Sequence, residues 1–259
     1  MQSDDVIEAL RGLGIRVSKE AVRALLVDAT KTRASPTETV EKLVALERGD
    51  RDRRNLDRRM RFATLGSFKA LDGFDWSWPR SVDKALYEQL CTLEFVEDGN
   101  NVLLRGQSGT GKTTLAQNLG LLALQKGYRV RFSTLAGALA DLLKQESLPA
   151  LDRRLRRYTR PDLLILDEIG YLPQDSRSAD LLYNIISRRH ENASIVITTN
   201  LSFKLWNTVF PGAACVVALV DRFSQHCHVV DIDADSWRQR PSRPSPTRPA
   251  AVNRKPKRR

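Results

Sequence analysis

Apolar residues recur at helical spacing through the N-terminal part of the chain. Over residues 4–15 and 19–30 they return every three or four positions, which predicts two amphipathic helices, the second capped by Ser18. Residues 35–38 (SPTE) have the form of a capping box with proline at the first helical position, and they predict a third helix. Three short helices would make a small N-terminal domain, which could read DNA as a helix-turn-helix or dock another protein.

Farther along the chain, short apolar strands alternate with helices. Strands are predicted at residues 101–105, 128–133, 163–166, 194–199 and 228–232. Helices are predicted at residues 112–126, through 135–143, at 178–190 and near 218–225, and one more at 81–96 precedes the first strand. Residues 163–166 (LLIL) are fully apolar, which is typical of a strand buried on both faces. The alternation predicts an α/β fold with a five-stranded parallel sheet that has helices on both faces.

Three segments of this pattern are more polar or more aromatic. Residues 48–61 contain seven arginines among three aspartates, so they could follow DNA phosphates or form a salt-bridged, solvated helix, and the aspartates slightly favour the second. Residues 148–160 form a basic amphipathic segment. Residues 71–79 (LDGFDWSWP) are rich in turn formers, and Trp76 and Trp78 could stack on bases or seal a domain edge.

Composition adds a strong charge asymmetry. The net charge is +11, yet residues 238–259 hold nine Lys or Arg and no Asp or Glu, which leaves +2 for the rest. This proline-rich tail is expected to be disordered, and it favours contact with a polyanion, although a solvated tail also aids solubility. Compared with this tail, Arg53, Arg54, Arg58 and Arg59 are expected to contribute more to DNA affinity if DNA follows the assembled protomers, because a disordered tail binds diffusely.

The chain shows no feature of a membrane or secreted protein. No apolar run approaches the length of a membrane span, and the N-terminus is acidic where a secretory signal would be basic. Cys91, Cys215 and Cys227 form no spaced framework. These observations predict a cytoplasmic protein with free thiols and no membrane partner.

Residues 106–113 (GQSGTGKT) match the phosphate-loop pattern G-x-x-x-x-G-K-[ST] at every fixed position. A preceding strand and a following helix would point several backbone N–H groups and a helix dipole at one spot, which favours a bound phosphate. Lys112 is expected to reach the β- and γ-phosphates of ATP, and Thr113 to offer a hydroxyl to Mg²⁺. The predicted nucleotide-binding residues are Gly106, Gln107, Ser108, Gly109, Thr110, Gly111, Lys112, Thr113 and Thr114.

Polar residues follow three of the later predicted elements. Asp167 is suited to hold Mg²⁺ through its water shell, and Glu168 to orient and deprotonate the water that attacks the γ-phosphate. Asn200 ends another apolar strand at the carboxyl edge, where its amide can hold that water or sense the γ-phosphate. Arg222, just before the last strand, could project into the nucleotide of a neighbouring protomer.

His226, Cys227 and His228 are the residue types that bind metals, but their order argues against a shared ion. Alternate residues of a strand face opposite sides, and no second ligand pair follows nearby. The sequence therefore predicts no metal site there.

These motifs, in this order, resemble the AAA+ ATPases of the IstB/DnaC group, and most closely the IstB-like helper ATPases of insertion-sequence transposition. The matching stretches are NVLLRGQSGTGKTTLA, GYRVRF, RRYTRPDLLILDEIGYLP, ADLLYNIISRR, IVITTNLSF and ALVDRFSQHCHVVDI followed by DSWR, and the similarity covers about residues 1–240. The resemblance implies that Asn200 lies between Lys112 and Glu168 as sensor 1. It also implies that Arg222 is an arginine finger acting in trans, and that Arg238, or Arg240 in its place, is sensor 2.

The chain departs from the pattern of this group in two places. Little sequence remains after the last strand for a helical lid, and residues 206–218 follow the pattern only loosely. With these exceptions, the implied organisation is a helical N-terminal domain (1–62), an AAA+ ATPase domain (63–237) and a basic tail (238–259).

The resemblance implies an ATP-hydrolysing switch with ATP and Mg²⁺ as cofactors. Such a switch would assemble on double-stranded DNA as a homo-oligomer, with ATP at protomer interfaces, and would direct a transposase to its target sites. A DnaC-type loader of a replicative helicase is the alternative with the same chemistry. A nucleotide-dependent adaptor with vestigial hydrolysis is a third reading, against which the intact Lys112, Asp167 and Glu168 argue.

Overall fold

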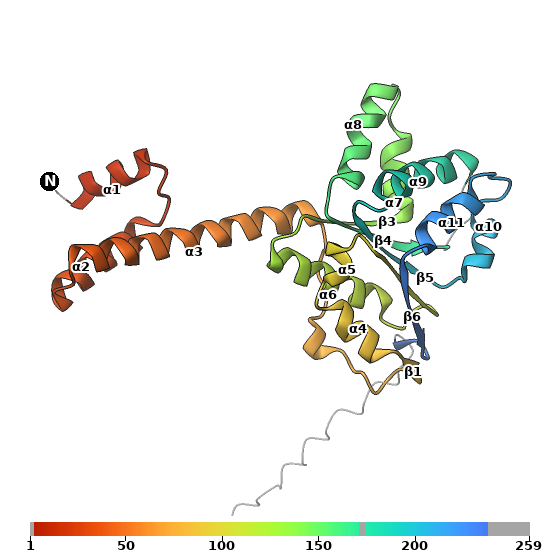
Figure 1. Ribbon diagram of the computed structural model, residues 1–259, viewed down its shortest axis with the longest axis horizontal. Coiled ribbons are helices and arrows are strands. Elements are labelled where there is room, and N and C mark those ends of the chain that lie inside the picture. The colour runs from red at the N-terminus through yellow and green to blue at the C-terminus, as the bar shows by residue number, and fades with distance from the viewer. Residues whose placement is uncertain (1–2, 171–174, 238–259) are drawn as a thin grey trace, which may run out of the picture.

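The computed structural model describes residues 3–170 and 175–237, which form a helical N-terminal unit and an α/β body. The two parts stand apart and are joined by one long helix (Figure 1). The N-terminal helices are α1 (Ser3–Gly12), α2 (Lys19–Thr32) and α3 (Pro36–Ala63). No helix of the described residues is long and apolar enough to cross a membrane.

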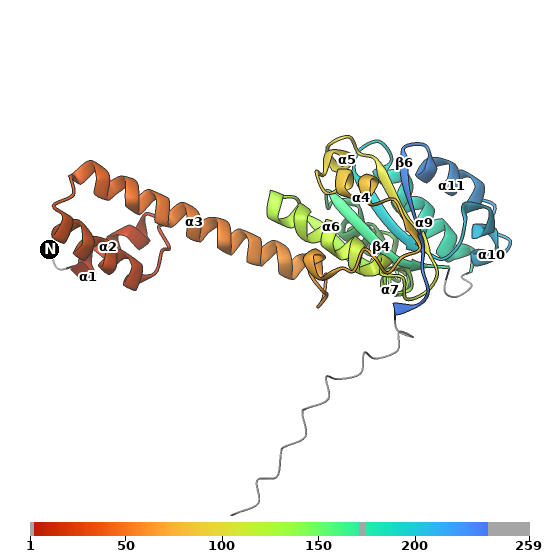
Figure 2. The same cartoon turned by 90° about the horizontal axis from the view of Figure 1, so that it is seen from below.

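Helix α3 is the element that joins the two parts. The predicted capping box is present, because Ser35 Oγ accepts from the Glu38 N–H at 3.2 Å and the Glu38 carboxylate accepts from the Ser35 N–H at 2.7 Å. The predicted third helix and the arginine-rich segment 48–61 form one continuous helix of 28 residues. Figure 2 shows this helix running from the N-terminal unit to the body, where its last residue, Ala63, is fully buried.

Glu47 fixes α3 to the N-terminal unit. Its carboxylate accepts hydrogen bonds from the backbone N–H groups of Arg16 (2.7 Å) and Val17 (2.9 Å), and it pairs with Arg54 (3.1 Å) and Arg51 (3.4 Å). Burial raises the pKa of this carboxyl, but the hydrogen bonds and the two arginines outweigh burial and hold the pKa below its ordinary value. Two arginines of α3 are therefore partners of a structural carboxylate.

The body contains a six-stranded sheet in the order β1-β6-β2-β5-β4-β3. The strands are β1 (Ser81–Val82), β2 (Asn101–Gly106), β3 (Val130–Thr134), β4 (Leu163–Ile169), β5 (Ser194–Thr199) and β6 (Cys227–Asp233). Five of them are parallel, as the sequence predicts. The sixth, β1, runs antiparallel to β6 and was missed, since two residues are too few to show an alternating pattern.

The predicted helix at residues 81–96 is wrong in two places. Its first residues form β1, so helix α4 (Lys84–Leu90) begins later, where the Asp83 side chain accepts from the Leu86 N–H at 2.8 Å. Leu93, with φ of +68°, then separates α4 from the one-turn helix α5 (Glu94–Glu97). A left-handed residue ends an α-helix, and sequence periodicity does not reveal one.

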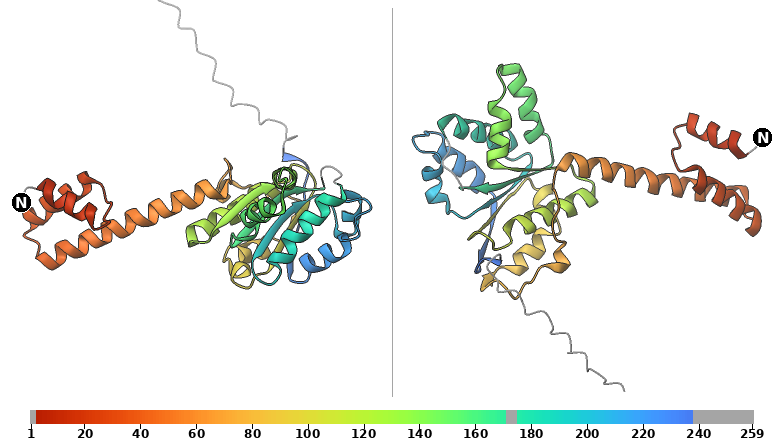
Figure 3. Two further views of the ribbon diagram at one scale, coloured as in Figure 1. Left: turned by 90° about the horizontal axis from the view of Figure 1, so that it is seen from above. Right: turned by 180° about the vertical axis from the view of Figure 1, so that it is seen from behind.

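Helices cover both faces of the sheet, which is the doubly wound arrangement the sequence predicts (Figure 3). The remaining helices are α6 (Lys112–Lys126), α7 (Leu135–Leu143), α8 (Leu148–Thr159), α9 (Ser176–Arg189), α10 (Trp206–Val209) and α11 (Val216–Ser224), with 3₁₀ turns at Leu71–Gly73 and Phe203–Leu205. Helices α4 to α6 and the end of α3 share one hydrophobic core with the sheet, and α7 to α11 share the other.

Helices α7 and α8 rise together beyond the sheet edge formed by β3 (Figure 1). A buried arginine anchors this projection. The Arg189 guanidinium donates, at 2.6 to 3.3 Å, to the backbone carbonyls of Tyr158, Thr159, Pro161, Asp162 and Ser194. Burial lowers the pKa of Arg189 to about 9, so it remains charged at neutral pH and holds the end of α8 against the starts of β4 and β5.

Candidate active site

The phosphate loop lies between β2 and α6, where the sequence predicts it. Helix α6 begins at Lys112, and the two preceding loop glycines, Gly109 and Gly111, have φ of +81° and +93°. These left-handed conformations turn the chain so that the loop curls over the N-terminus of α6. A Cβ on Gly111 would lie 2.7 Å from the Phe74 ring, so the loop also requires glycine for close packing.

Two side chains of the phosphate loop have hydrogen-bond partners, one within the loop and one on strand β4. Lys112 Nζ donates to the Gln107 carbonyl at 2.6 Å, within the loop itself. Thr113 Oγ1 donates to the Asp167 carboxylate, at 2.9 Å from Oδ1 and 3.1 Å from Oδ2. Asp167 is 3% exposed, whereas its neighbour Glu168 is exposed. The two acids of β4 are thus separated, one against the loop and one facing outward.

Three of the four predicted catalytic residues, Lys112, Glu168 and Asn200, meet in one cleft at the carboxyl edge of the sheet. Strand β5 lies between β2 and β4, so Asn200 is placed between the phosphate loop and Glu168. Lys112, Thr113, Glu168 and Asn200 line the same cleft. Four residues from three separate chain segments therefore converge on the space beside the loop.

Arg222 lies elsewhere, on α11 next to α9 (Figure 1). It donates to the Ser187 hydroxyl, and its guanidinium carbon lies 4.9 Å from the centroid of the Tyr183 ring. Arg222 does not line the cleft at the phosphate loop. The two other predicted arginines, Arg238 and Arg240, lie outside the described residues together with the basic tail.

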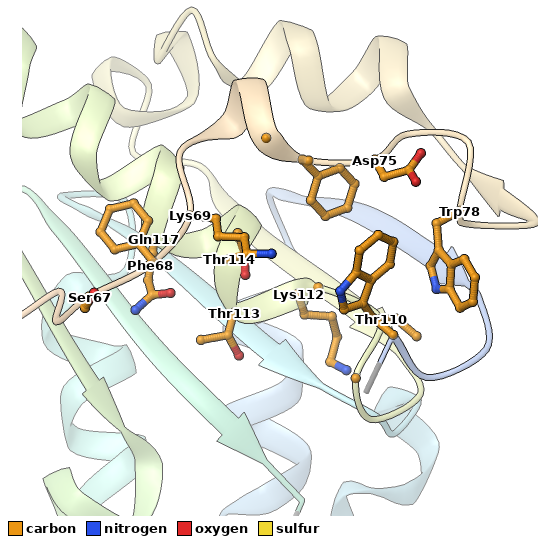
Figure 4. Close-up of a pocket in the computed structure, with 15 residues that line it drawn as sticks. Ser67, Phe68, Lys69, Asp75, Trp78, Thr110, Lys112, Thr113, Thr114 and Gln117 are labelled. Carbon is orange, nitrogen blue, oxygen red and sulfur yellow. The ribbon is translucent and has the colours of Figure 1, made fainter. Parts of the chain in front are cut away.

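A second hollow of about 370 Å³ continues from the phosphate loop toward the linker, which is the segment of residues 64–80 between α3 and β1. Figure 4 shows Lys69, Asp75 and Trp78 of the linker around the same space as Lys112 and Thr113 of the loop. Trp237 also lines this hollow, in edge contact with Trp78 at 5.2 Å between ring centroids, and the backbone N–H of Trp237 donates to the Gly109 carbonyl at 3.0 Å.

Comparison with known proteins agrees with this geometry. The model of the IstB-like ATP binding protein family matches residues 9–245. A Pseudomonas aeruginosa protein, named for ATP binding in insertion sequence IS21, is 35% identical over 222 residues, covering 86% of this chain and 84% of the relative.

The chain belongs to the IstB-like ATP binding protein family. Among solved structures, AMPPCP-bound DnaA from Aquifex aeolicus matches with a TM-score of 0.54 and 23% identity, covering 66% of this chain and 52% of DnaA. The DnaC helicase loader matches with a TM-score of 0.50 and 20% identity, covering 63% and 96%. These likenesses show the fold, which is that of an AAA+ P-loop protein. With the family and the complete phosphate loop, this IstB-like chain is an AAA+ ATPase.

Two residues of this IstB-like site were not singled out from the sequence. Thr198 donates to Asp167 and accepts from the Glu168 N–H. The sequence signal that could have identified it is the pair of hydroxyl residues, Thr198 and Thr199, at the end of an apolar strand. Trp237 lines the hollow beside Trp78, but a lone tryptophan after the last strand carried no distinguishing pattern. For Trp76 the sealing role is observed, since its ring packs between Phe74 and Tyr87.

His226 lies just before β6, and Cys227 and His228 are the first two residues of that strand. Among residues 3–170 and 175–237, no group of three His, Cys, Asp or Glu is arranged to hold a metal ion. Burial raises the pKa of the Cys227 thiol to about 12.

Proposed function

We propose that this protein is an ATP-dependent, DNA-binding AAA+ switch that helps the transposase of the same insertion sequence to select target sites and transfer strands. The observation that carries the proposal is a cleft lined by the phosphate loop, Glu168 and Asn200, in a chain that belongs to a family of insertion-sequence proteins. The helicase-loader alternative draws on the likeness to DnaC, which concerns the fold alone.

The phosphate end of ATP fits the loop side of the cleft. Lys112 and the N–H groups at the start of α6 would hold the phosphates, and Asn200 would sense the γ-phosphate. Asp167 and Thr113 offer a carboxylate and a hydroxyl within 3.1 Å of each other, the oxygen donors that Mg²⁺ prefers. Bound there, Mg²⁺ would neutralise charge on the phosphates. Glu168, exposed into the cleft, would take the proton of the attacking water.

The nucleoside end of ATP fits the second hollow. Trp78 and Trp237 offer aromatic faces on which a base can stack, and the hollow adjoins Thr113 and Thr114 at the start of α6. Trp78 Nε1 donates to the Asp235 carbonyl at 2.9 Å, so its ring is held in place before any ligand arrives. A base bound there would contact the linker and the segment after β6 together, which would make both respond to nucleotide.

A neighbouring protomer would complete the catalytic site. Glu168 and Lys112 share the cleft, but the guanidinium of Arg222 rests on Tyr183 and Ser187 of its own chain. The half-buried Arg222 lies on α11, away from the phosphate loop of its own chain, and this supports a role for it at the ATP site of another copy. ATP would then bridge protomers, and hydrolysis would loosen the assembly.

The DNA contact is assigned by comparing two arginine-rich helices. On α3, Arg53 pairs with Asp50, Arg54 pairs with both Glu47 and Asp50, and Arg59 donates to the Leu124 carbonyl at 3.2 Å. These pairs support the salt-bridged reading of residues 48–61. Because the acids lie on the same helix, α3 offers DNA less net charge than its arginine content indicates.

Helix α8 has fewer acids for its arginines. Four arginines, Arg153, Arg156, Arg157 and Arg160, recur at spacings of three and four, on the side opposite the buried Leu155 and Tyr158. Arg156 pairs with Asp152, which also pairs with Arg188. Arg153 and Arg160 are exposed and have no partner among the residues that the structure describes. We therefore assign phosphate contacts to this outward face of α8.

The experiment is a titration of fluorescent duplex DNA by anisotropy with ATP, with ADP and without nucleotide, at several salt concentrations. We expect ATP-dependent binding that weakens steeply with salt, alongside ATP-dependent assembly in sedimentation. Adding the transposase encoded by the same element should then raise strand transfer. Absence of duplex affinity at low salt with ATP would contradict the DNA switch, and stable capture of a replicative helicase instead of the transposase would favour the loader.

A further inference from the structure

The end of β4 contains a β-bulge at the two acids of the site. Leu166 pairs with Ile197 and Ile169 pairs with Thr199, so Asp167 and Glu168 together oppose the single residue Thr198. Two residues facing one is the defining feature of a bulge, and it redirects side chains out of the regular alternation. Here the bulge allows Asp167 to stay buried while Glu168 reaches the cleft.

The bulge places Glu168 in an uncommon backbone conformation. Its φ is +64°, in the left-handed region that residues other than glycine rarely adopt. Such a conformation persists only where surrounding contacts hold it. Since the extra residue of a bulge is left out of the strand ladder, the Glu168 N–H needs a partner other than a β5 carbonyl.

Thr198 provides that partner with its side chain. Its hydroxyl accepts from the Glu168 N–H at 3.0 Å and donates to Asp167 Oδ1, so the donor and an acceptor site of one hydroxyl are used on the two acids. Thr198 is 1% exposed, so water does not compete for these bonds. The β-branched side chain on a central strand also has restricted rotation, which fixes the hydroxyl.

We propose that Thr198 is a positioning residue for ATP hydrolysis, which orients Asp167 toward Thr113 and fixes the backbone from which Glu168 projects. The proposal rests on the proposed roles of Asp167 and Glu168. This role requires no contact between Thr198 and the phosphates or the attacking water. It acts by holding the two acids in their different directions, and without its hydroxyl Glu168 would leave its strained conformation and Asp167 would lose one of its two hydroxyl donors.

The test compares Thr198→Val, which keeps the branched shape, and Thr198→Ala with Thr198→Ser, which keeps the hydroxyl. The matched control is Ser194→Ala on the same strand, because the Ser194 hydroxyl is fully buried and donates to the Phe95 carbonyl at 2.8 Å, at the far end of β5. Steady-state hydrolysis gives kcat and KM. Fluorescent ATP binding with and without Mg²⁺, and thermal unfolding, provide readouts that do not depend on turnover.

We expect Thr198→Val and Thr198→Ala to lower kcat at least about tenfold, with nucleotide affinity in the absence of Mg²⁺ within about twofold of the parent. The gain in affinity that Mg²⁺ confers should shrink, because Asp167 is less well oriented. Thr198→Ser should restore most of kcat. Ser194→Ala should lower the unfolding temperature and leave kcat within about twofold.

Wild-type kcat in Thr198→Val, or equal impairment of Thr198→Ser and Thr198→Val, would overturn the proposal. The proposal would also be overturned if Thr198→Val and Ser194→Ala had the same unfolding temperature and the same loss of kcat. Failure of the proposed function is a separate outcome, in which Glu168→Gln itself hydrolyses ATP at the parent rate.

Discussion

The carboxyl edge of the sheet and the outward face of α8 both concentrate charged residues, but they hold them differently. At the edge, Asp167 is fixed by the hydroxyls of Thr113 and Thr198, and Lys112 is bonded to its own loop. On α8, Arg153 and Arg160 extend into solvent. Fixed geometry suits one ligand bound in one orientation, whereas exposed cations suit a polymer of repeating phosphates. We therefore expect a substitution at the carboxyl edge to reduce turnover far more than a substitution on α8 reduces DNA affinity.

The largest effect is expected from Glu168→Gln. It leaves the phosphate loop intact and removes the carboxylate that we propose deprotonates the attacking water, so turnover should fall at least about a hundredfold while ATP binding persists. Steady-state hydrolysis and fluorescent nucleotide binding measure the two quantities. Glu146→Gln, at an exposed position between α7 and α8, is the control and should match the parent. Unchanged hydrolysis in Glu168→Gln would remove Glu168 from its role.

Arg222→Ala tests whether one protomer alone supplies every catalytic residue of the site at the carboxyl edge. Alone it should lower turnover at least about tenfold, because the arginine finger that we propose to stabilise the transferring phosphoryl group is missing from every interface. Mixing it with Glu168→Gln protomers should restore part of the activity at interfaces that pair an intact Glu168 with an intact Arg222. Arg177→Ala, at an exposed position on α9, controls for loss of positive charge. Full activity in a dilute sample shown to be monomeric would contradict action in trans.

The double substitution Arg153→Gln and Arg160→Gln tests the proposed DNA contact on the outward face of α8. Duplex affinity should fall about tenfold, and the slope of log affinity against log salt should become shallower by about two, because two phosphate contacts are lost. Basal hydrolysis should stay at the parent level. The matched control on α3, Arg53→Gln with Arg58→Gln, removes the same charge and spares Arg54 and Arg59. An equal or larger loss in that control would move the DNA contact to α3.

A local effect on stability, outside the ATP site, is expected from Glu47→Gln, which weakens the attachment of α3 to the other N-terminal helices. Replacing a buried carboxylate that accepts two backbone N–H bonds should cost about 1.5–3 kcal/mol of local stability. Hydrogen exchange in residues 3–46 measures this, with Glu41→Gln as the exposed control.

The pH dependence of the same region sharpens that test. Because the pKa of Glu47 is lower in the folded protein than in the unfolded chain, its contribution is fully present above the unfolded pKa and is lost as the pH falls through the folded pKa. Protection in the parent should thus fall in acid, below about pH 4.3, more steeply than in Glu47→Gln. Equal acid sensitivity in both proteins would contradict the assignment.

Short-range sequence patterns predicted much of the fold, and within the site they predicted the phosphate loop and the two acids of β4. The phosphate loop is contiguous, so eight residues specify a strand end, a turn and a helix start without help from the rest of the chain. Helix α6 begins and ends at the predicted residues for this reason, with Gly127 at its C-cap. The apolar run of β4 marked a buried strand, and the acids after it marked the carboxyl edge.

Only the tertiary structure decided which distant side chains meet. The placement of β5 between β2 and β4 was implied by resemblance alone, because the order of strands depends on packing between elements far apart in sequence. The bulge opposite Thr198 arises from a shift between two strands, and neither strand shows it alone. The arginines of α3 and α8 look alike in sequence. What separates them is which carboxylates the fold brings within reach, and for Glu47 that depends on the backbone of a different segment, at Arg16 and Val17.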